Sequence, residues 1–154
     1  MRHTPYHWAN TALFYYFLAV MAWAPLPLAS NRDWSTRLLA GLLLAGLVWA
    51  LLLLLLRRLR LSAALCAAWP ALAALAAAQV WVAAQLALGI SVEPASTRQA
   101  LLLGWALVAA FVLVLLLVDS GQRVSSATRV LVWCGVAQAF FAGAMMMLGV
   151  EQVA

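Results

Sequence analysis

The sequence is unusually poor in charge. Only 8% of its 154 residues are charged, lysine is absent, and four acidic residues accompany nine arginines. About a quarter of the residues in a typical soluble domain are charged, whereas this chain is 68% hydrophobic with a mean hydropathy of +1.04. The scarcity of charge therefore excludes a soluble domain and predicts an integral membrane protein.

Cysteine is also scarce. Cys66 and Cys134 both fall inside apolar segments, at no spacing that suits a metal site or a disulfide. His3 and His7, near the N-terminus, are interpreted as solvated residues rather than as metal ligands. We therefore expect no metal and no other cofactor.

Ionisable side chains are absent from the middle of every long apolar run. Transporters and proton pumps usually need an intramembrane carboxylate, histidine or lysine, so a small transporter or channel is disfavoured. P-loop, dinucleotide-binding and nucleophile-elbow motifs are missing as well. The deepest polar side chains, Gln79, Gln85 and Gln138, are expected to hydrogen-bond between helices. No catalytic residue can be assigned in this chain alone.

The chain instead has a series of long apolar runs. The clearest, residues 38–56, carries no charge, and at about 1.5 Å of rise per residue it nearly covers the ~30 Å hydrocarbon core of a bilayer. The other runs predict spans at 9–29, 61–88, 100–118 and 130–150. The predicted fold is all-α, a polytopic bundle of about five spans that forms a single transmembrane domain over residues 1–154.

Two of these runs have features of their own. A cleaved signal peptide is the rival interpretation of 9–29, but its length and its bulky aromatics favour a retained helix. Run 61–88 is long, rich in alanine and contains Pro70, which predicts a kinked helix or an interfacial first turn followed by the span. Its alanines predict burial in the bundle, because small residues permit close helix packing.

The arginines predict the orientation. Arg57, Arg58 and Arg60 directly follow the run 38–56, and short basic loops are retained in the cytoplasm. This places the N-terminus in the cytoplasm, the C-terminus in the periplasm and the chain in a bacterial inner membrane. The other arginines divide evenly between the two sides, so the orientation depends on this one loop. The net charge of +5 is thus a topology signal, and no nucleic-acid partner is expected.

Three arginines fall on the predicted periplasmic side. Arg32 and Arg37 flank a polar turn, and Arg98 begins a later helix, which Ser96 or Thr97 is expected to cap. A guanidinium fork matches phosphate oxygens, so all three are candidate ligands for a diphosphate. Alternatively, they are interfacial anchors that pair with ordinary lipid phosphates or with nearby carboxylates.

The last run contains a stripe of small residues. Gly135, Ala139 and Gly143 recur every four residues, with Gln138 beside them. This pattern favours close helix packing in a membrane. The partner would be a further helix of the same protein or a partner membrane subunit.

Three stretches resemble the bacterial O-antigen ligase and O-antigen polymerase family. Residues 24–34 read A-P-L-P-L-A-S-N-R-D-W, similar to the family's A-P-L-P-L-G-S-N-R-P-W. Residues 91–98 read S-V-E-P-A-S-T-R, similar to S-V-D-P-x-A-T-R. Residues 135–143 read G-V-A-Q-A-F-F-A-G, similar to G-x-x-Q-A-x-x-G. The three landmarks occur in the family's order.

The resemblance implies a polytopic inner-membrane glycosyltransferase of lipopolysaccharide and cell-envelope synthesis. Such enzymes take a glycan from an undecaprenyl diphosphate carrier and pass it to the lipid A core or to another carrier-linked chain. Arginines would stabilise the diphosphate leaving group, and a histidine would activate the acceptor hydroxyl. Neither a metal nor a nucleotide sugar would be needed.

The chain also departs from the family. Relatives have more spans, and their catalytic histidine lies in a later periplasmic loop, whereas this sequence ends at Ala154. Ala29 replaces the family's glycine and Asp33 its proline, and Asp33 would partly neutralise Arg32. We therefore expect the noncatalytic N-terminal portion of such an enzyme. The alternative is a self-contained scaffold or regulatory subunit of a cell-envelope complex.

Overall fold

The fold is all-helical in the part of the chain that the structure, a computed structural model, describes: residues 7–24, 33–59 and 61–147. The helices there are α1 (His7–Trp23), α3 (Asp33–Leu55), α4 (Ala63–Ala67), α5 (Trp69–Ala87), α6 (Pro94–Leu117) and α7 (Gly121–Met147). The predicted all-α class is therefore confirmed for these residues.

Four helices, α3, α5, α6 and α7, are long and apolar enough to cross a membrane. This indicates a membrane protein. Helix α1 has 17 residues and is slightly shorter. The expected first span, 9–29, continues into residues 25–32, which lie outside the described part.

The expected span 61–88 is divided into two helices. Helix α4 is capped by Ser62, whose hydroxyl accepts a hydrogen bond from the Leu65 N–H at 3.1 Å, and it ends at Ala67. Helix α5 then begins at Trp69, and Pro70 stands in its first turn. Proline is tolerated there because the first N–H groups of a helix have no intrahelical acceptor. The proline thus marks the start of the spanning helix rather than a kink within it.

Helix α6 begins earlier than expected. It starts at Pro94, with Glu93 in the N-cap position, and not near residue 100. The expectation that Ser96 or Thr97 caps the helix is wrong. The Thr97 hydroxyl donates instead to the carbonyl of Glu93 at 3.0 Å, inside the first turn.

Helix α7 also begins before its predicted span. Residues 121–129, expected to be a polar loop, are its first turns. The Ser126 hydroxyl donates to the Gln122 carbonyl at 3.0 Å, and Arg129 Nη2 donates to Ser125 Oγ at 3.1 Å. These bonds between residues four apart let the polar segment continue as a helix.

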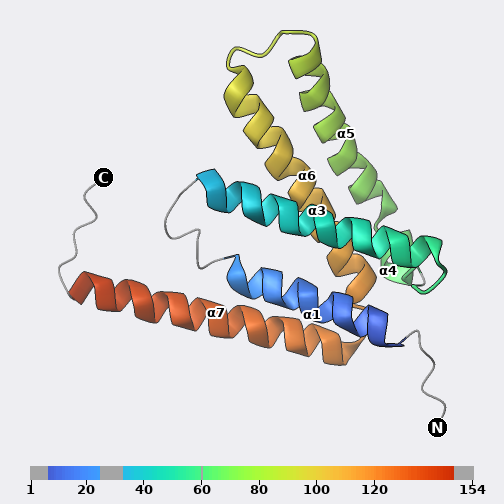
Figure 1. Ribbon diagram of the computed structural model, residues 1–154, viewed down its shortest axis with the longest axis vertical. Coiled ribbons are helices and arrows are strands. Elements are labelled where there is room, and N and C mark those ends of the chain that lie inside the picture. The colour runs from blue at the N-terminus through green and yellow to red at the C-terminus, as the bar shows by residue number, and fades with distance from the viewer. Residues whose placement is uncertain (1–6, 25–32, 60, 148–154) are drawn as a thin grey trace.

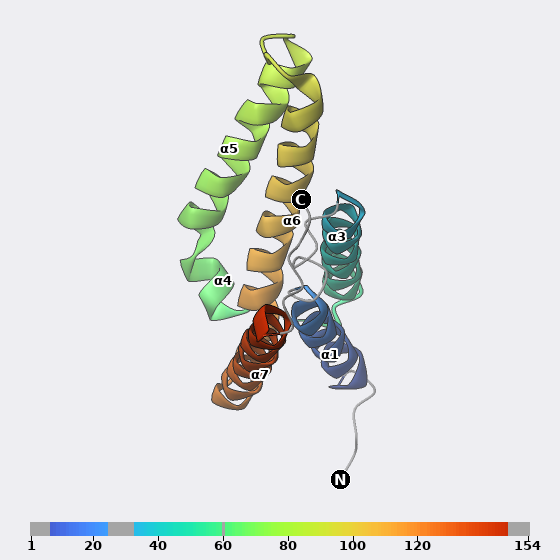
Figure 2. The ribbon, with the colours of Figure 1, turned by 90° about the vertical axis from the view of Figure 1, so that its left-hand side faces the viewer.

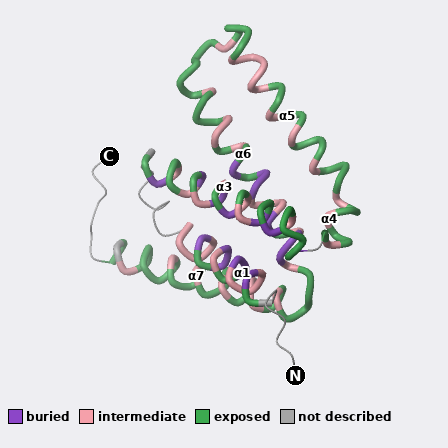
Figure 3. The backbone as a smooth tube through the Cα atoms, turned by 45° about the vertical axis from the view of Figure 1, so that its right-hand side comes forward, coloured by how far each residue is buried: buried purple, intermediate pink, exposed green. Residues whose placement is uncertain are grey.

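The core lies between α1, α3 and α6 (Figure 3). A Cβ on Gly46 of α3 would lie 3.0 Å from Tyr16 Cε1 and 3.2 Å from Leu113 Cδ1, so the three helices approach closely there. The Tyr16 hydroxyl donates to the Leu42 carbonyl at 2.8 Å, and its ring meets Trp49 edge-on at 5.7 Å. One polar bond and tight apolar packing together hold α1 on α3.

Helices α5 and α7 lie at the periphery. Neither has a buried residue among those described. Helix α5 packs through one face on α6, and this hairpin leans away from α7 (Figures 1 and 2). The expectation that the alanine-rich run 61–88 is buried in the bundle is therefore wrong for the described chain. Its alanines instead permit close contact with α6 alone.

Successive long helices alternate in direction. The start of α1, residues 57–59 and 61–62, the end of α6 and the start of α7 gather at one end, here called the basic end (Figure 1). Two hydrogen bonds hold this grouping together. Ser62 Oγ donates to the Leu115 carbonyl at 2.5 Å, and Arg123 Nη1 donates to Asn10 Oδ1 at 3.3 Å.

Candidate functional site

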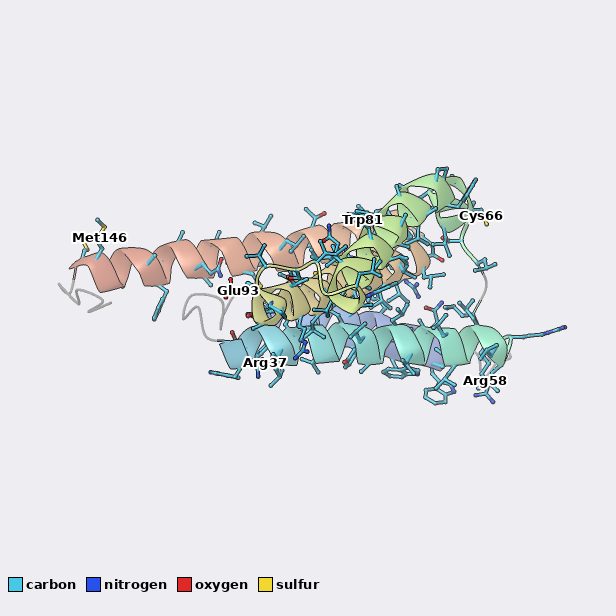
Figure 4. The ribbon with its side chains drawn as sticks, turned by 90° about the horizontal axis from the view of Figure 1, so that it is seen from above. Arg37, Arg58, Cys66, Trp81, Glu93 and Met146 are labelled. Atoms are coloured by element: carbon cyan, nitrogen blue, oxygen red, sulfur yellow. The ribbon has the colours of Figure 1, made fainter. Side chains whose placement is uncertain are left out.

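The two candidate phosphate-binding arginines that the structure describes, Arg37 and Arg98, lie away from the basic end. Arg37 and Arg58 lie near opposite ends of α3 (Figure 4). Arg98 is exposed in the first turns of α6, at the far end of that helix from the basic end. Arg32 falls outside the described residues. The structure therefore describes two of the three candidates, Arg37 and Arg98, both of them solvent-accessible.

Arg98 borders a groove between α3 and α6. The groove has a volume of about 340 Å³ and is lined by Leu44, Arg98, Leu101, Leu102 and Trp105. The α6 members are three, four and seven residues beyond Arg98, so they share one helix face. The result is a single guanidinium at the start of an otherwise apolar groove.

The Arg98 guanidinium is not paired with the nearest carboxylate in the sequence. Glu93 is exposed at the N-cap position of α6, and the described residues contain no ion pair between it and Arg98. Arg37 does not line the groove. Of the two described arginines, Arg98 therefore has the surroundings that better suit an amphipathic ligand, and nothing described brings Arg37 into the same site.

The small-residue stripe lies on the outer part of α7, beyond Cys134. Cys134 Sγ lies 3.7 Å from the Ala22 carbonyl, so residues 135–147 extend past the last turn of α1. A Cβ on Gly135 or Gly143 would meet no described atom within 4 Å. Ala139 and Gly143 line a shallow apolar groove, and Gln138 is half-buried. Use of the stripe for helix packing thus stays a prediction about a partner outside the described structure.

A polar pocket at the basic end was missed by the sequence reasoning. It has a volume of about 410 Å³ and lies between α1 and α7, with Arg123 in its wall. The sequence shows Arg123 only as one more basic residue near a membrane boundary. Its spacing of four from Asp119 was the available signal, but the contribution of Asn10 and Phe14 from α1 depends on tertiary structure.

The described residues contain no candidate site for a metal ion. No set of three or more His, Cys, Asp or Glu side chains is close enough there to hold an ion. Cys66 and Cys134 are free thiols. His3 lies outside the described residues.

Comparisons with known protein families, with curated proteins and with solved structures gave no match to this chain.

Proposed function

We propose that the chain is the N-terminal membrane portion of a glycosyltransferase similar to the O-antigen ligases and polymerases. In this proposal the groove beside Arg98 holds the diphosphate and the first isoprene units of an undecaprenyl-diphosphate-linked glycan. The observation that carries the proposal is the single arginine at the start of an apolar groove lined by Leu44, Leu101, Leu102 and Trp105. The sequence resemblance supplies the identity of the lipid.

The groove has the polarity that a polyprenyl diphosphate requires. The guanidinium offers parallel N–H donors to phosphate oxygens, and it keeps its charge at any physiological pH. The leucines and Trp105 offer apolar area to the isoprenoid. Because both parts of the groove lie on one face of α6, a lipid aligned with this helix meets the charge and the apolar surface together.

The orientation belongs to the same proposal. The chain would cross a bacterial inner membrane five times, with its N-terminus in the cytoplasm and its C-terminus in the periplasm. Two exposed arginines at the basic end, Arg57 and Arg58, support a cytoplasmic location of that end. Arg98, at the far end of α6, would then face the periplasm, where a lipid-linked glycan is transferred.

The chain would bind the carrier without catalysing transfer. The family's histidine, which would activate the acceptor hydroxyl, has no counterpart in the matching stretches of this sequence. Arg98 would neutralise charge that develops on the diphosphate as the glycosidic bond breaks. Further helices would supply the general base and the acceptor site.

Binding of the carrier tests the groove directly. The purified chain in detergent should bind undecaprenyl diphosphate more tightly than uncharged undecaprenol in native mass spectrometry. Arg98→Gln should remove most of this difference, about tenfold in affinity for a charge-assisted phosphate contact. Arg129→Gln, an exposed change on α7, is the matched control and should have no effect. Equal binding of the two lipids by the unaltered chain would refute the groove assignment.

Complementation tests the enzyme class. A strain that lacks its O-antigen ligase or polymerase should stay defective with this segment alone. It should regain glycan transfer when the segment is co-expressed with a C-terminal half of the family that carries the catalytic histidine. Failure of the pair, with both parts present in the membrane, would favour the scaffold.

The scaffold alternative is favoured by one observation, the exposed apolar side chains on the outer part of α7. Phe140 is 81% exposed and Met146 is 88% exposed in the part of α7 beyond Cys134. A partner subunit that packs on the small-residue stripe would cover these side chains. A single cysteine at Ala139 should then crosslink to another protein in cells that contain no glycosyltransferase remainder.

A further inference from the structure

The polar pocket at the basic end lies between α1 and α7, two helices that run side by side (Figure 1). The pocket residues that matter for binding are Asn10, Phe14, Tyr15, Asp119, Gln122 and Arg123. Its volume of about 410 Å³ falls within the range of small-molecule sites. It lies within the first turns of both helices, beside the basic end of the bundle.

Arg123 is held in one orientation in this pocket. Its Nη1 donates to the Leu117 carbonyl at 2.8 Å and to Asn10 Oδ1 at 3.3 Å. Its guanidinium carbon lies 5.0 Å above the centre of the Phe14 ring. Only 17% of the side chain is exposed. The end of α6 and the face of Phe14 together preorganise the guanidinium, so a ligand need not order it.

Asp119 adds one negative charge to the same pocket. Its Oδ1 lies 3.5 Å from Arg123 Nη1, and 51% of the side chain is exposed. At 3.5 Å this contact is long for a charge-assisted hydrogen bond, so the interaction between the two groups is weak. The pocket therefore carries one cation and one anion side by side, and the interaction between them is weak.

We propose that this pocket binds the headgroup of a zwitterionic phospholipid, phosphatidylethanolamine. The phosphate would contact Arg123, and the ammonium would donate to Asp119 and to the amide oxygen of Gln122. The balanced charges favour this lipid over an anionic phosphatidylglycerol, which has a phosphate for Arg123 but no ammonium to pair with Asp119. They favour it over phosphatidylcholine because a quaternary ammonium has no N–H to donate.

The acyl chains of the lipid would leave the pocket beside Tyr15. The Tyr15 side chain borders the pocket and is 64% exposed on α1. Amphipathic rings of this kind favour the headgroup boundary. The site is separate from the groove beside Arg98, and both leaflets can contain this lipid. The inference therefore stands whichever way the chain is oriented and whether or not it belongs to a glycosyltransferase.

Lipid selectivity of the purified chain tests the proposal. The delipidated protein in detergent should retain phosphatidylethanolamine over phosphatidylglycerol and phosphatidylcholine by about fivefold in native mass spectrometry. Asp119→Asn should reverse the order of the first two lipids, because the pocket then carries an uncompensated positive charge. Glu93→Gln, which removes an exposed carboxylate at the other end of α6, is the matched control and should keep the original order. Equal retention of all three lipids, or an unchanged order in Asp119→Asn, would overturn the proposal.

Two further measurements separate binding from folding and from a soluble ligand. Arg123→Lys keeps the charge but loses the planar fork, and it should weaken phosphatidylethanolamine retention while the helical circular dichroism stays unchanged. Arg129→Gln on the same helix should retain the lipid normally. Soluble glycerophosphoethanolamine should bind far more weakly than the lipid, and equal affinity would show that the ligand is a soluble phosphate ester instead.

Discussion

Gln79 of α5 lies directly over Gly104 of α6, so close that a Cβ at residue 104 would overlap the Gln79 amide. The glycine thus leaves room for the Gln79 amide in the hairpin of α5 and α6 (Figure 2). In a membrane, where apolar side chains gain little by leaving lipid, such close approach is a main source of helix association. Gly104 is therefore a point of close contact between α5 and α6.

A bulky residue at 104 should separate α5 from α6. We expect Gly104→Leu to destabilise the folded chain by about 2 kcal/mol, because the leucine must displace the Gln79 amide and the rest of its side chain then meets the α5 surface. The measurement is thermal unfolding in detergent followed by circular dichroism. Gly41→Leu is the matched control, because a Cβ at residue 41 meets no described atom within 4 Å. An equal fall in both variants would mean that the glycine matters only for its backbone.

A double substitution isolates the contact itself. In the background of Gln79→Ala the space over residue 104 is empty, so Gly104→Ala should stabilise the chain by up to about 1 kcal/mol through helix propensity. In the wild-type background the same change must displace the amide, and the gain should disappear. Additive effects of the two changes would contradict direct contact.

Much of this fold follows from the sequence, and the departures have local causes. The absence of charge in 38–56 suffices to predict α3, because length and apolarity set a span. Hydropathy predicts starts for α6 and α7 that are too late in the sequence, because it assigns polar residues to loops. Thr97 and Ser126 instead bond to carbonyls four residues back, which hydropathy does not register.

Tyr16 provides a second test of the core. Its hydroxyl bonds to the Leu42 carbonyl at 2.8 Å, an acceptor that the helix of α3 already uses. Tyr16→Phe should therefore cost only about 0.6 kcal/mol, the usual value of a hydrogen bond between membrane helices. Tyr15→Phe is the control, because Tyr15 is 64% exposed, and its unfolding midpoint should not move. A loss of several kcal/mol at Tyr16 would indicate that the ring is also displaced.

Arg57, two residues after the end of α3, has a strained backbone conformation. Its φ is +53°, a left-handed conformation that costs a residue with a side chain about 1 kcal/mol and costs glycine little. Arg57→Gly should therefore raise the free energy of unfolding by up to about 1 kcal/mol. Arg58→Gly, at a neighbouring position outside that conformation, should lower it through the added backbone entropy of the unfolded chain. A stabilising effect of both changes would point to relief of charge repulsion instead.

The candidate sites could be predicted less fully than the fold. Arg98 was identified because a guanidinium at a membrane boundary stands out in an apolar sequence. The groove below it depends on Leu44, which α3 brings to α6 from more than fifty residues away. The pocket around Arg123 likewise needs Asn10 and Phe14 from α1. A single sequence contains the side chains of both sites but not the crossings of helices that assemble them.

The proposed orientation predicts which residues face the cell exterior. In a chain with Cys66 and Cys134 replaced by alanine, a cysteine at Ser96 should react with a membrane-impermeant thiol reagent in intact cells. A cysteine at Ser125 should react only after the membrane is opened. Both positions are exposed, and they lie near opposite ends of the bundle, so accessibility alone would not distinguish them. Labelling at Ser125 but not at Ser96 would invert the topology and place Arg98 in the cytoplasm, away from any periplasmic glycan. The proposed function would then fail, whereas the phosphatidylethanolamine pocket would remain.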